Sequence, residues 1–174
     1  KLLNSLNQQT FIPRLTFLIY TSNKYVYKDL YSKKYRQFFL LPELENKFKF
    51  ERVIFQLQKN NNLGIVVHTR SLDLINEYIN QNNEDILKQQ IINKFNQVFI
   101  NSRSINLLRG DENVSIMRWR ASQPLNVSVP FSLQFSKNFR IGFCGDWFEG
   151  EGFGRIEGAI LSALELAEKF NSLN

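Results

Sequence analysis

Glycine is distributed very unevenly along this chain of 174 residues. Six of the eight glycines lie between positions 142 and 170, in the segment GFCGDWFEGEGFGRIEGAILSALELAEKF. We expect a buried strand ending near Cys144, then a glycine-rich loop over 145–154 and a helix beginning near Arg155. The apolar stripe of that helix recurs at helical spacing: Ile156, Ala159, Ile160, Ala163, Ala167 and Phe170. Its small residues, Gly158 among them, would let it approach other backbone closely.

The predicted loop and helix start could together form a site for a polar ligand. A glycine-rich loop before a helix offers unpaired N–H groups and the positive end of the helix dipole. Asp146, just after the strand, could accept hydrogen bonds from hydroxyl groups. The spacing differs from the dinucleotide fingerprint G-x-G-x-x-G, whose last position falls on Arg155 or Glu157 instead of glycine. From spacing alone, a flexible loop before an ordinary core helix remains the alternative.

The rest of the chain predicts an α+β fold. Four short segments rich in β-branched and aromatic residues, 14–20, 37–41, 51–58 and 63–69, are typical of strands, and 114–122 is another. The asparagine-rich turn between the third and fourth favours an antiparallel pair. Residues 83–99 instead place Leu87, Ile91 and Phe95 at helical spacing. We therefore expect a mostly antiparallel sheet with its helices gathered on one side.

Composition excludes several classes of protein. Hydrophobic residues make up 43% and charged residues 22%, which is typical of globular domains. No run of about 18 apolar residues is present, so no membrane partner is expected. One cysteine excludes an internal disulfide framework and favours a reducing, cytoplasmic location. A single histidine and a single cysteine argue against a structural zinc site, so no metal is predicted. The first residues lack an initiator Met and a signal peptide's apolar core, which suggests a piece of a longer protein.

Positive charge and aromatic residues gather in segment 24–59. It holds nine Lys and Arg against four Asp and Glu, a net charge of +5 out of +6 for the chain. Such a segment could bind phosphates or single-stranded nucleic acid. The residues alone favour the other interpretation, a solvated sheet surface with its aromatics turned inward. Because no nucleic-acid motif accompanies the segment, we do not expect a nucleic-acid partner.

Two further segments extend the C-terminal pattern into a family resemblance. CGDWFEGEGFGRIEGAILSALELAEKF resembles the C-terminal flavin motif of amine-oxidase-type flavoproteins, in which a Gly-Asp strand end precedes a helix with an acidic residue and glycine in its first turn. RWRASQP (118–124) and LGIVVHT (63–69) resemble the renalase branch in order and spacing. The resemblance covers about residues 11–172 and is most specific over 141–170. The loop WFEGEGF departs from the renalase pattern in composition.

The resemblance implies a two-domain FAD-dependent oxidoreductase of which this chain is a part. Residues 1–138 would form the substrate-binding domain. Residues 139–174 would be the strand, loop and helix that complete an otherwise absent Rossmann-like FAD-binding domain. The chain alone would then be inactive and would not retain FAD. An apolar surface left by the absent domain would promote self-association.

The resemblance also assigns residues to the cofactor. Gly145 and Asp146 match the Gly-Asp pair that meets the ribityl and pyrophosphate part of FAD. The start of the last helix would turn its N–H groups toward the flavin pyrimidine edge, where negative charge develops on reduction. The predicted cofactor-binding residues are Gly145, Asp146, Gly154, Arg155, Ile156 and Glu157.

His68 and Trp119 are the predicted residues of the substrate cavity. The residues alone favour a hydrogen-bonded structural histidine at the end of an apolar strand. The resemblance instead implies that His68 faces the substrate beside the flavin, as a catalytic residue that orients it or handles a proton. Trp119 is either a core aromatic or, by the resemblance, a wall of the flavin cavity. Its neighbours Arg118 and Arg120 should point to the opposite face of the strand.

The predicted activity follows from the resemblance. It is hydride transfer from a small molecule to flavin, with reoxidation by dioxygen. The renalase branch implies dihydro-nicotinamide dinucleotides as substrates and the wider family implies amines. The alternative from another class is a non-catalytic module that uses segment 24–59 to bind an anionic or nucleic-acid partner.

Overall fold

The computed structural model describes residues 2–23, 26, 36–58, 62–81, 84–99 and 107–172. The chain divides into two compact units, which are described separately. The sheet unit is Pro13–Trp119, and the tail unit comprises Lys1–Ile12 with Arg120–Asn174. Within the described ranges, no helix combines the length and apolar character needed to cross a membrane.

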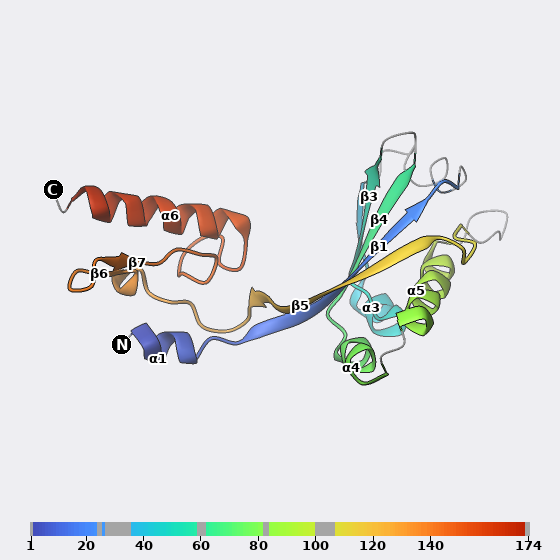
Figure 1. Ribbon diagram of the computed structural model, residues 1–174, viewed down its shortest axis with the longest axis horizontal. Coiled ribbons are helices and arrows are strands. Elements are labelled where there is room, and N and C mark those ends of the chain that lie inside the picture. Colours follow the sequence, from blue (N-terminus) through green and yellow to red (C-terminus); the bar gives the residue numbers. More distant parts are fainter. Residues whose placement is uncertain are drawn as a thin grey trace. The chain divides into compact units, whose positions relative to one another are not determined.

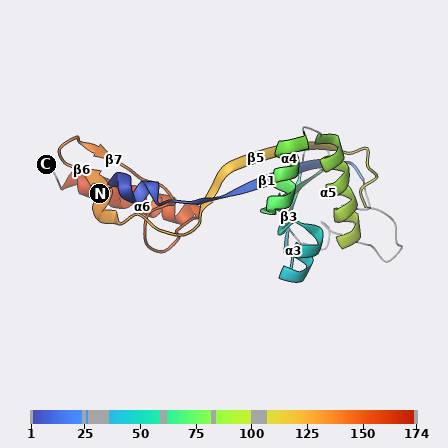
Figure 2. The ribbon, with the colours of Figure 1, turned by 90° about the horizontal axis from the view of Figure 1, so that it is seen from below.

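A five-stranded sheet organises the sheet unit, and its strand order is β2-β3-β4-β1-β5. The pairs β2–β3, β3–β4 and β4–β1 are antiparallel. Strands β1 and β5 run side by side in both views (Figures 1 and 2), and both continue past the unit boundary. The strands are β1 Phe11–Thr21, β2 Gln37–Phe39, β3 Arg52–Leu57, β4 Leu63–Thr69 and β5 Asn113–Pro124.

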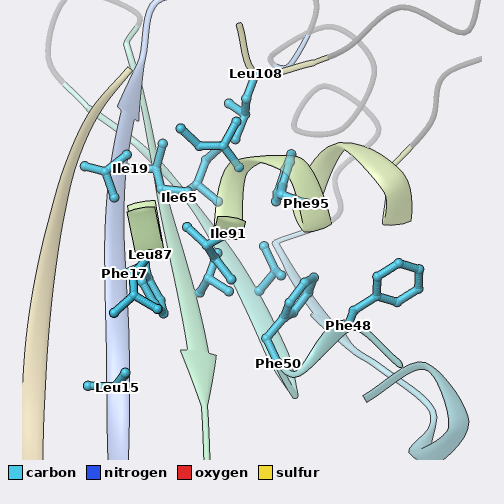
Figure 3. Close-up of a cluster of buried hydrophobic side chains, with 14 of the residues drawn as sticks. Leu15, Phe17, Ile19, Phe48, Phe50, Ile65, Leu87, Ile91, Phe95 and Leu108 are labelled. Carbon is cyan, nitrogen blue, oxygen red and sulfur yellow. The ribbon is translucent and has the colours of Figure 1, made fainter. Parts of the chain in front are cut away.

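The helices of the sheet unit bury their apolar residues against one face of this sheet. Phe17 of β1 and Ile65 of β4 belong to the same buried cluster as Leu87, Ile91 and Phe95 of α5 (Figure 3). Alternation along each strand explains why only one face contributes, since successive side chains point to opposite sides. The helices of this unit are α3 Pro42–Phe48, α4 Leu72–Gln81 and α5 Glu84–Val98.

These elements confirm the predicted α+β class and its mostly antiparallel sheet. The five predicted strands are present with shifted ends, and β3 pairs with β4 as the turn between them predicts. The helix predicted over 83–99 is α5, with its stripe buried. Asn83 and all four tyrosines of residues 24–35 lie outside the described residues. The Rossmann-like assignment of the tail remains a prediction.

Besides the ends of β1 and β5 and a short 3₁₀ turn at Phe131–Leu133, the described part of the tail unit holds two helices and one hairpin. Gln134, fully buried, donates from Nε2 to the Ser162 carbonyl and so ties the loop region to the last helix. The elements are α1 Leu2–Asn7, the hairpin of β6 Phe135–Ser136 with β7 Ile141–Gly142, and α6 Ile156–Asn171.

The prediction of a buried strand ending near Cys144 is wrong. Strand β7 has two residues and pairs with β6, while Ile141 is 49% exposed and Cys144 is exposed. A tight hairpin explains the difference, because the chain turns over 137–140 with Arg140 at φ 51° and leaves little length for pairing. Helix α6 begins at Ile156, as expected.

The compact units divide between residues 12 and 13 and between 119 and 120, not at the predicted 138/139 boundary. Residues 120–138 belong with the tail, and so do residues 1–12. Backbone and side-chain bonds hold these two stretches together: Leu125 N–H donates to the Thr10 carbonyl, and Asn126 Oδ1 accepts from Thr10 N–H. The assignment of a substrate domain and a flavin tail stays a prediction.

Candidate functional site

The face of the sheet that does not contribute to the helix-covered core carries a row of five side chains, one from each strand. The register pairs Phe39 with Arg52, Arg52 with His68, and His68 with Thr16. Trp119 of β5 completes the row through a hydrogen bond to Thr16. We call these five residues the cross-strand row. It contains both predicted cavity residues, His68 and Trp119, which lie far apart in sequence.

Thr16 is the junction of the row. Thr16 is only 4% exposed, and its Oγ1 lies 3.0 Å from His68 Nδ1. The Trp119 Nε1–H donates to the same oxygen at 3.1 Å. An indole nitrogen can only donate, so Thr16 must accept there. We assign the remaining hydroxyl proton to His68 Nδ1, because no other acceptor for it is found among the described residues and a buried donor is satisfied in this way.

This arrangement defines the form of the imidazole. With Nδ1 accepting from Thr16, neutral His68 carries its proton on Nε2. The pKa of His68 is lowered to about 4, first by burial and then by the nearby charges of Arg52 and Arg14. The ring is therefore neutral at pH 7 and presents Nε2–H as a donor. A role as hydrogen-bond donor suits this state better than a role as proton acceptor.

The two ends of the row expose aromatic surface. Phe39 is 70% exposed, and the guanidinium carbon of Arg52 lies 5.9 Å from its ring centroid. Trp119 is 46% exposed, which contradicts its interpretation as a core aromatic.

Arg118 precedes Trp119 on β5 and points to the other face of the sheet. It lines a small hollow with Tyr78 of α4 and Glu84 of α5, as the strand alternation predicted.

Three arginines near the row differ in how their charge is balanced. Arg14 forms a 2.8 Å ion pair with Glu51. Arg70 contacts Glu45 at 2.9 Å and Glu51 at 3.4 Å. Arg52 has no ion pair within the described part of the chain, and its buried Nε has no hydrogen-bond partner there. One positive charge on this face is therefore uncompensated by the described residues.

The row is the feature that sequence reasoning found only in part. His68 and Trp119 were predicted as cavity residues, whereas Arg52 and Phe39 entered only as part of the basic segment 24–59 and Thr16 was not predicted at all. Thr16 could have been placed on the face opposite Leu15 and Phe17, because side chains alternate along the predicted strand RLTFLIY. Which strands are neighbours depends on non-local pairing, so the row could not be assembled from sequence.

The glycine-rich loop forms a close crossing with α6 in the tail unit. A Cβ on Gly158 would lie 2.3 Å from the Gly152 carbonyl oxygen, and Gly152 itself adopts φ +88°. Arg155 N–H donates to the Gly152 carbonyl at 2.8 Å. The predicted close approach of α6 to other backbone is thus confirmed, and glycine is required on both sides of it.

The predicted cofactor residues of the tail surround this crossing. Gly145 and Ser162 exchange hydrogen bonds, N–H to Oγ at 2.8 Å and Oγ–H to the carbonyl at 2.9 Å. The Asp146 carbonyl accepts from Gly154 N–H at 2.6 Å, which closes the loop between these residues just before α6 begins. The Asp146 carboxylate has no hydrogen bond or ion pair among the described residues.

The helix start itself is open. Arg155 is the N-cap residue of α6 and makes no capping hydrogen bond with its side chain. Arg155, Ile156 and Glu157 are exposed, and Ile156 is 79% exposed. The N-terminus of this 16-residue helix therefore has no side-chain cap, although the loop at Gly152 packs against it at Gly158. These residues lie in the tail unit and the cross-strand row in the sheet unit.

Two other observations bear on ligands. A hollow of about 530 Å³ opens where β1 ends and β5 begins, and it contains none of the predicted site residues. Within the described ranges, no three His, Cys, Asp or Glu side chains gather as metal ligands would.

Comparison with known proteins leaves the chain without a family assignment. No model of a known protein family matches it, and no curated protein matches it significantly.

Proposed function

We propose that this chain is part of an FAD-dependent oxidoreductase of the renalase and amine-oxidase type. The observation that carries the proposal is the meeting of His68 and Trp119 at Thr16 on the sheet face away from the helices. Both residues were selected by the family resemblance alone. A sheet covered by helices on one face leaves the other face for a ligand.

The tail unit has features that fit a flavin. Its helix N-terminus lacks a side-chain cap, its loop passes close to α6 because Gly152 and Gly158 lack Cβ atoms, and its Asp146 carboxylate is unengaged by the described residues. Asp146 and Gly145 would hold the ribityl and pyrophosphate region. The α6 N–H groups would stabilise negative charge at the pyrimidine edge. When bound, FAD would accept a hydride from the substrate and would then pass two electrons to dioxygen, which leaves as hydrogen peroxide.

His68 would orient the substrate in this proposal. Its neutral ring donates from Nε2 at pH 7, because burial and two arginines oppose protonation. Trp119 would wall the cavity and hold Thr16 in place through its Nε1–H. Small molecules, either dihydro-nicotinamide dinucleotides or amines, would be the substrates, in the cytoplasm. The ADP-binding part of FAD would be held by polypeptide outside these 174 residues.

The test is flavin content. The reading frame upstream of Lys1 would be expressed together with this chain, and the visible absorption spectrum of the purified protein recorded. We expect flavin bands that weaken in Asp146→Ala but not in Asp111→Ala, an exposed aspartate of the sheet unit. The 174-residue chain alone should purify without stoichiometric flavin. A colourless longer protein would overturn the proposal.

One observation favours the alternative of a binding module. Phe39 and Arg52 belong to the basic segment 24–59 and present an exposed ring beside a guanidinium. Such a pair can stack on a base and contact a phosphate. Salt-dependent retention of the chain on single-stranded nucleic acid, lost in Phe39→Ala, would favour this function over the flavin one.

A further inference from the structure

The cross-strand row presents two hydrogen-bond donors that the described protein does not use. The first is the Arg52 guanidinium, whose recorded contact is with the Phe39 ring and not with a carboxylate. The second is His68 Nε2–H, because Nδ1 is already occupied by Thr16. The register places these two residues directly opposite each other on β3 and β4. Side chains so paired have Cβ atoms about 4.5–5.5 Å apart.

Among the described residues, no unpaired carboxylate lies near these two donors. The two carboxylates in the vicinity, Glu45 and Glu51, are bound to Arg70 and Arg14. The other members of the row are two aromatic rings and Thr16, whose hydroxyl already has partners on both sides. A half-buried cation next to a neutral donor therefore calls for an acceptor from outside the described chain.

We propose that Arg52 and the Nε2–H of His68 form a subsite for an oxyanion, the carboxylate or phosphate group of a small ligand. The guanidinium offers a fork of donors that matches two oxygens of either group. The imidazole N–H adds a third donor without adding charge. The guanidinium lies over the ring of Phe39, with its carbon 5.9 Å from the ring centroid. The subsite is a property of the sheet face and does not depend on whether the longer protein binds flavin.

The single histidine makes the test direct. Long-range ¹H–¹⁵N spectra of the 174-residue chain contain one imidazole, so the Nε2 signal reports on His68 without assignment by mutation. The chain would be titrated at pH 7 and constant ionic strength with inorganic phosphate in one arm and benzoate in the other. We expect a saturable shift of the Nε2 resonance with millimolar affinity in at least one arm.

Substitutions of Arg52 and Arg70 distinguish binding at a specific subsite from general attraction of an anion to a basic surface. Arg52→Gln should weaken binding at least tenfold, which is about 1.4 kcal/mol. Arg70→Gln, the matched control, removes an equal charge that is already paired with Glu45 and should leave the affinity within twofold. Arg52→Lys keeps the charge but loses the fork, and it should weaken binding if Arg52→Gln fails to fold.

Each outcome of the titration either supports the subsite or overturns it. Saturation by phosphate alone assigns the ligand to phosphate compounds, and saturation by benzoate alone assigns it to carboxylates. No saturable shift in either arm overturns the subsite. So does an equal loss in the Arg52 and Arg70 variants, which would show a diffuse charge effect. None of these results depends on flavin content, so the subsite and the proposed function fail independently.

Discussion

At the scale of single residues, the hydroxyl of Thr16 determines what His68 can do. It accepts from Trp119 Nε1–H and is the partner of His68 Nδ1, which leaves Nε2 as the protonated nitrogen. A β-strand residue with a small polar side chain thus fixes a tautomer on the neighbouring strand. The ring becomes a donor by geometry, and its lowered pKa keeps it in that form at pH 7.

Thr16→Val tests this junction. Valine keeps the shape but removes the hydroxyl, so the indole N–H and His68 Nδ1 both lose a partner. We expect a loss of about 1–2 kcal/mol in the free energy of unfolding, measured by denaturant titration. The imidazole ¹⁵N spectrum should also shift from one dominant Nε2–H form toward a mixture. Thr10→Val, at an exposed threonine, is the control and should change neither. An unchanged spectrum in Thr16→Val would contradict the assigned tautomer.

His68 should make stability depend on pH in the acid range. Its pKa is about 4 in the folded chain and near 6.5 when unfolded, because burial and then Arg52 and Arg14 oppose the charged ring. Between these values the unfolded chain binds more protons, so the free energy of unfolding falls as pH falls from about 6.5 to 4. Screening of the half-buried ring limits the effect to about 1–2 kcal/mol.

The comparison of wild type with His68→Asn isolates that contribution. Carboxylates titrate in both proteins, so their effect cancels in the difference. We expect wild type to lose more stability than the variant between pH 7 and pH 4, measured by denaturant midpoints across the range. Parallel pH profiles would show that His68 is not held neutral. Titration of the single imidazole by NMR gives its pKa directly.

At the scale of elements, the start of α6 is shaped by the crossing of Gly152 and Gly158. The glycine clustering in the sequence pointed to this place, and the close approach is there. Local signals were sufficient for elements whose residues alternate or recur within a few positions, such as β4 and α5. They failed at Ile141–Cys144, where an apolar sequence suggested a buried strand but the chain forms a hairpin with an exposed outer side.

Gly158→Ala gives opposite predictions under two explanations of that glycine. Helix propensity alone predicts stabilisation by up to about 1 kcal/mol. The crossing predicts destabilisation of about 2 kcal/mol or more, because the new Cβ would lie 2.3 Å from the Gly152 carbonyl oxygen. Denaturant unfolding of the variant distinguishes the two by sign. Ala163→Gly, at an exposed position of α6, calibrates the propensity effect alone.

At the scale of the whole molecule, the grouping of the chain was the least predictable feature. The sequence suggested a division near 138, whereas residues 1–12 and 120–174 form one compact unit. Bonds between Thr10 and the segment at Leu125–Asn126 link parts more than a hundred positions apart. Such pairings carry no local signature. The cross-strand row was hidden for the same reason, since its five residues come from five strands.

Helix α6 presents an apolar stripe that the described residues leave uncovered. Ile156 is 79% exposed, Ile160 55% and Leu164 57%, while Gly158 and Ser162 on the inner side are buried. Ala163 and Ala167 are exposed along the same stripe. Under the proposed function, this surface would pack on the absent part of the FAD-binding domain.

The stripe should therefore make the isolated chain self-associate. We expect its weight-average mass in sedimentation equilibrium to rise with protein concentration, because pairing removes apolar area from water at about 25 cal/mol per Å². Ile160→Lys with Leu164→Lys should return the mass toward that of the monomer, since two charges in the stripe would have to be buried. Leu72→Lys, at a 60% exposed leucine of α4, adds charge elsewhere and should leave association unchanged. A chain that stays monomeric at high concentration, or that responds equally to both changes, would show that the stripe drives no association.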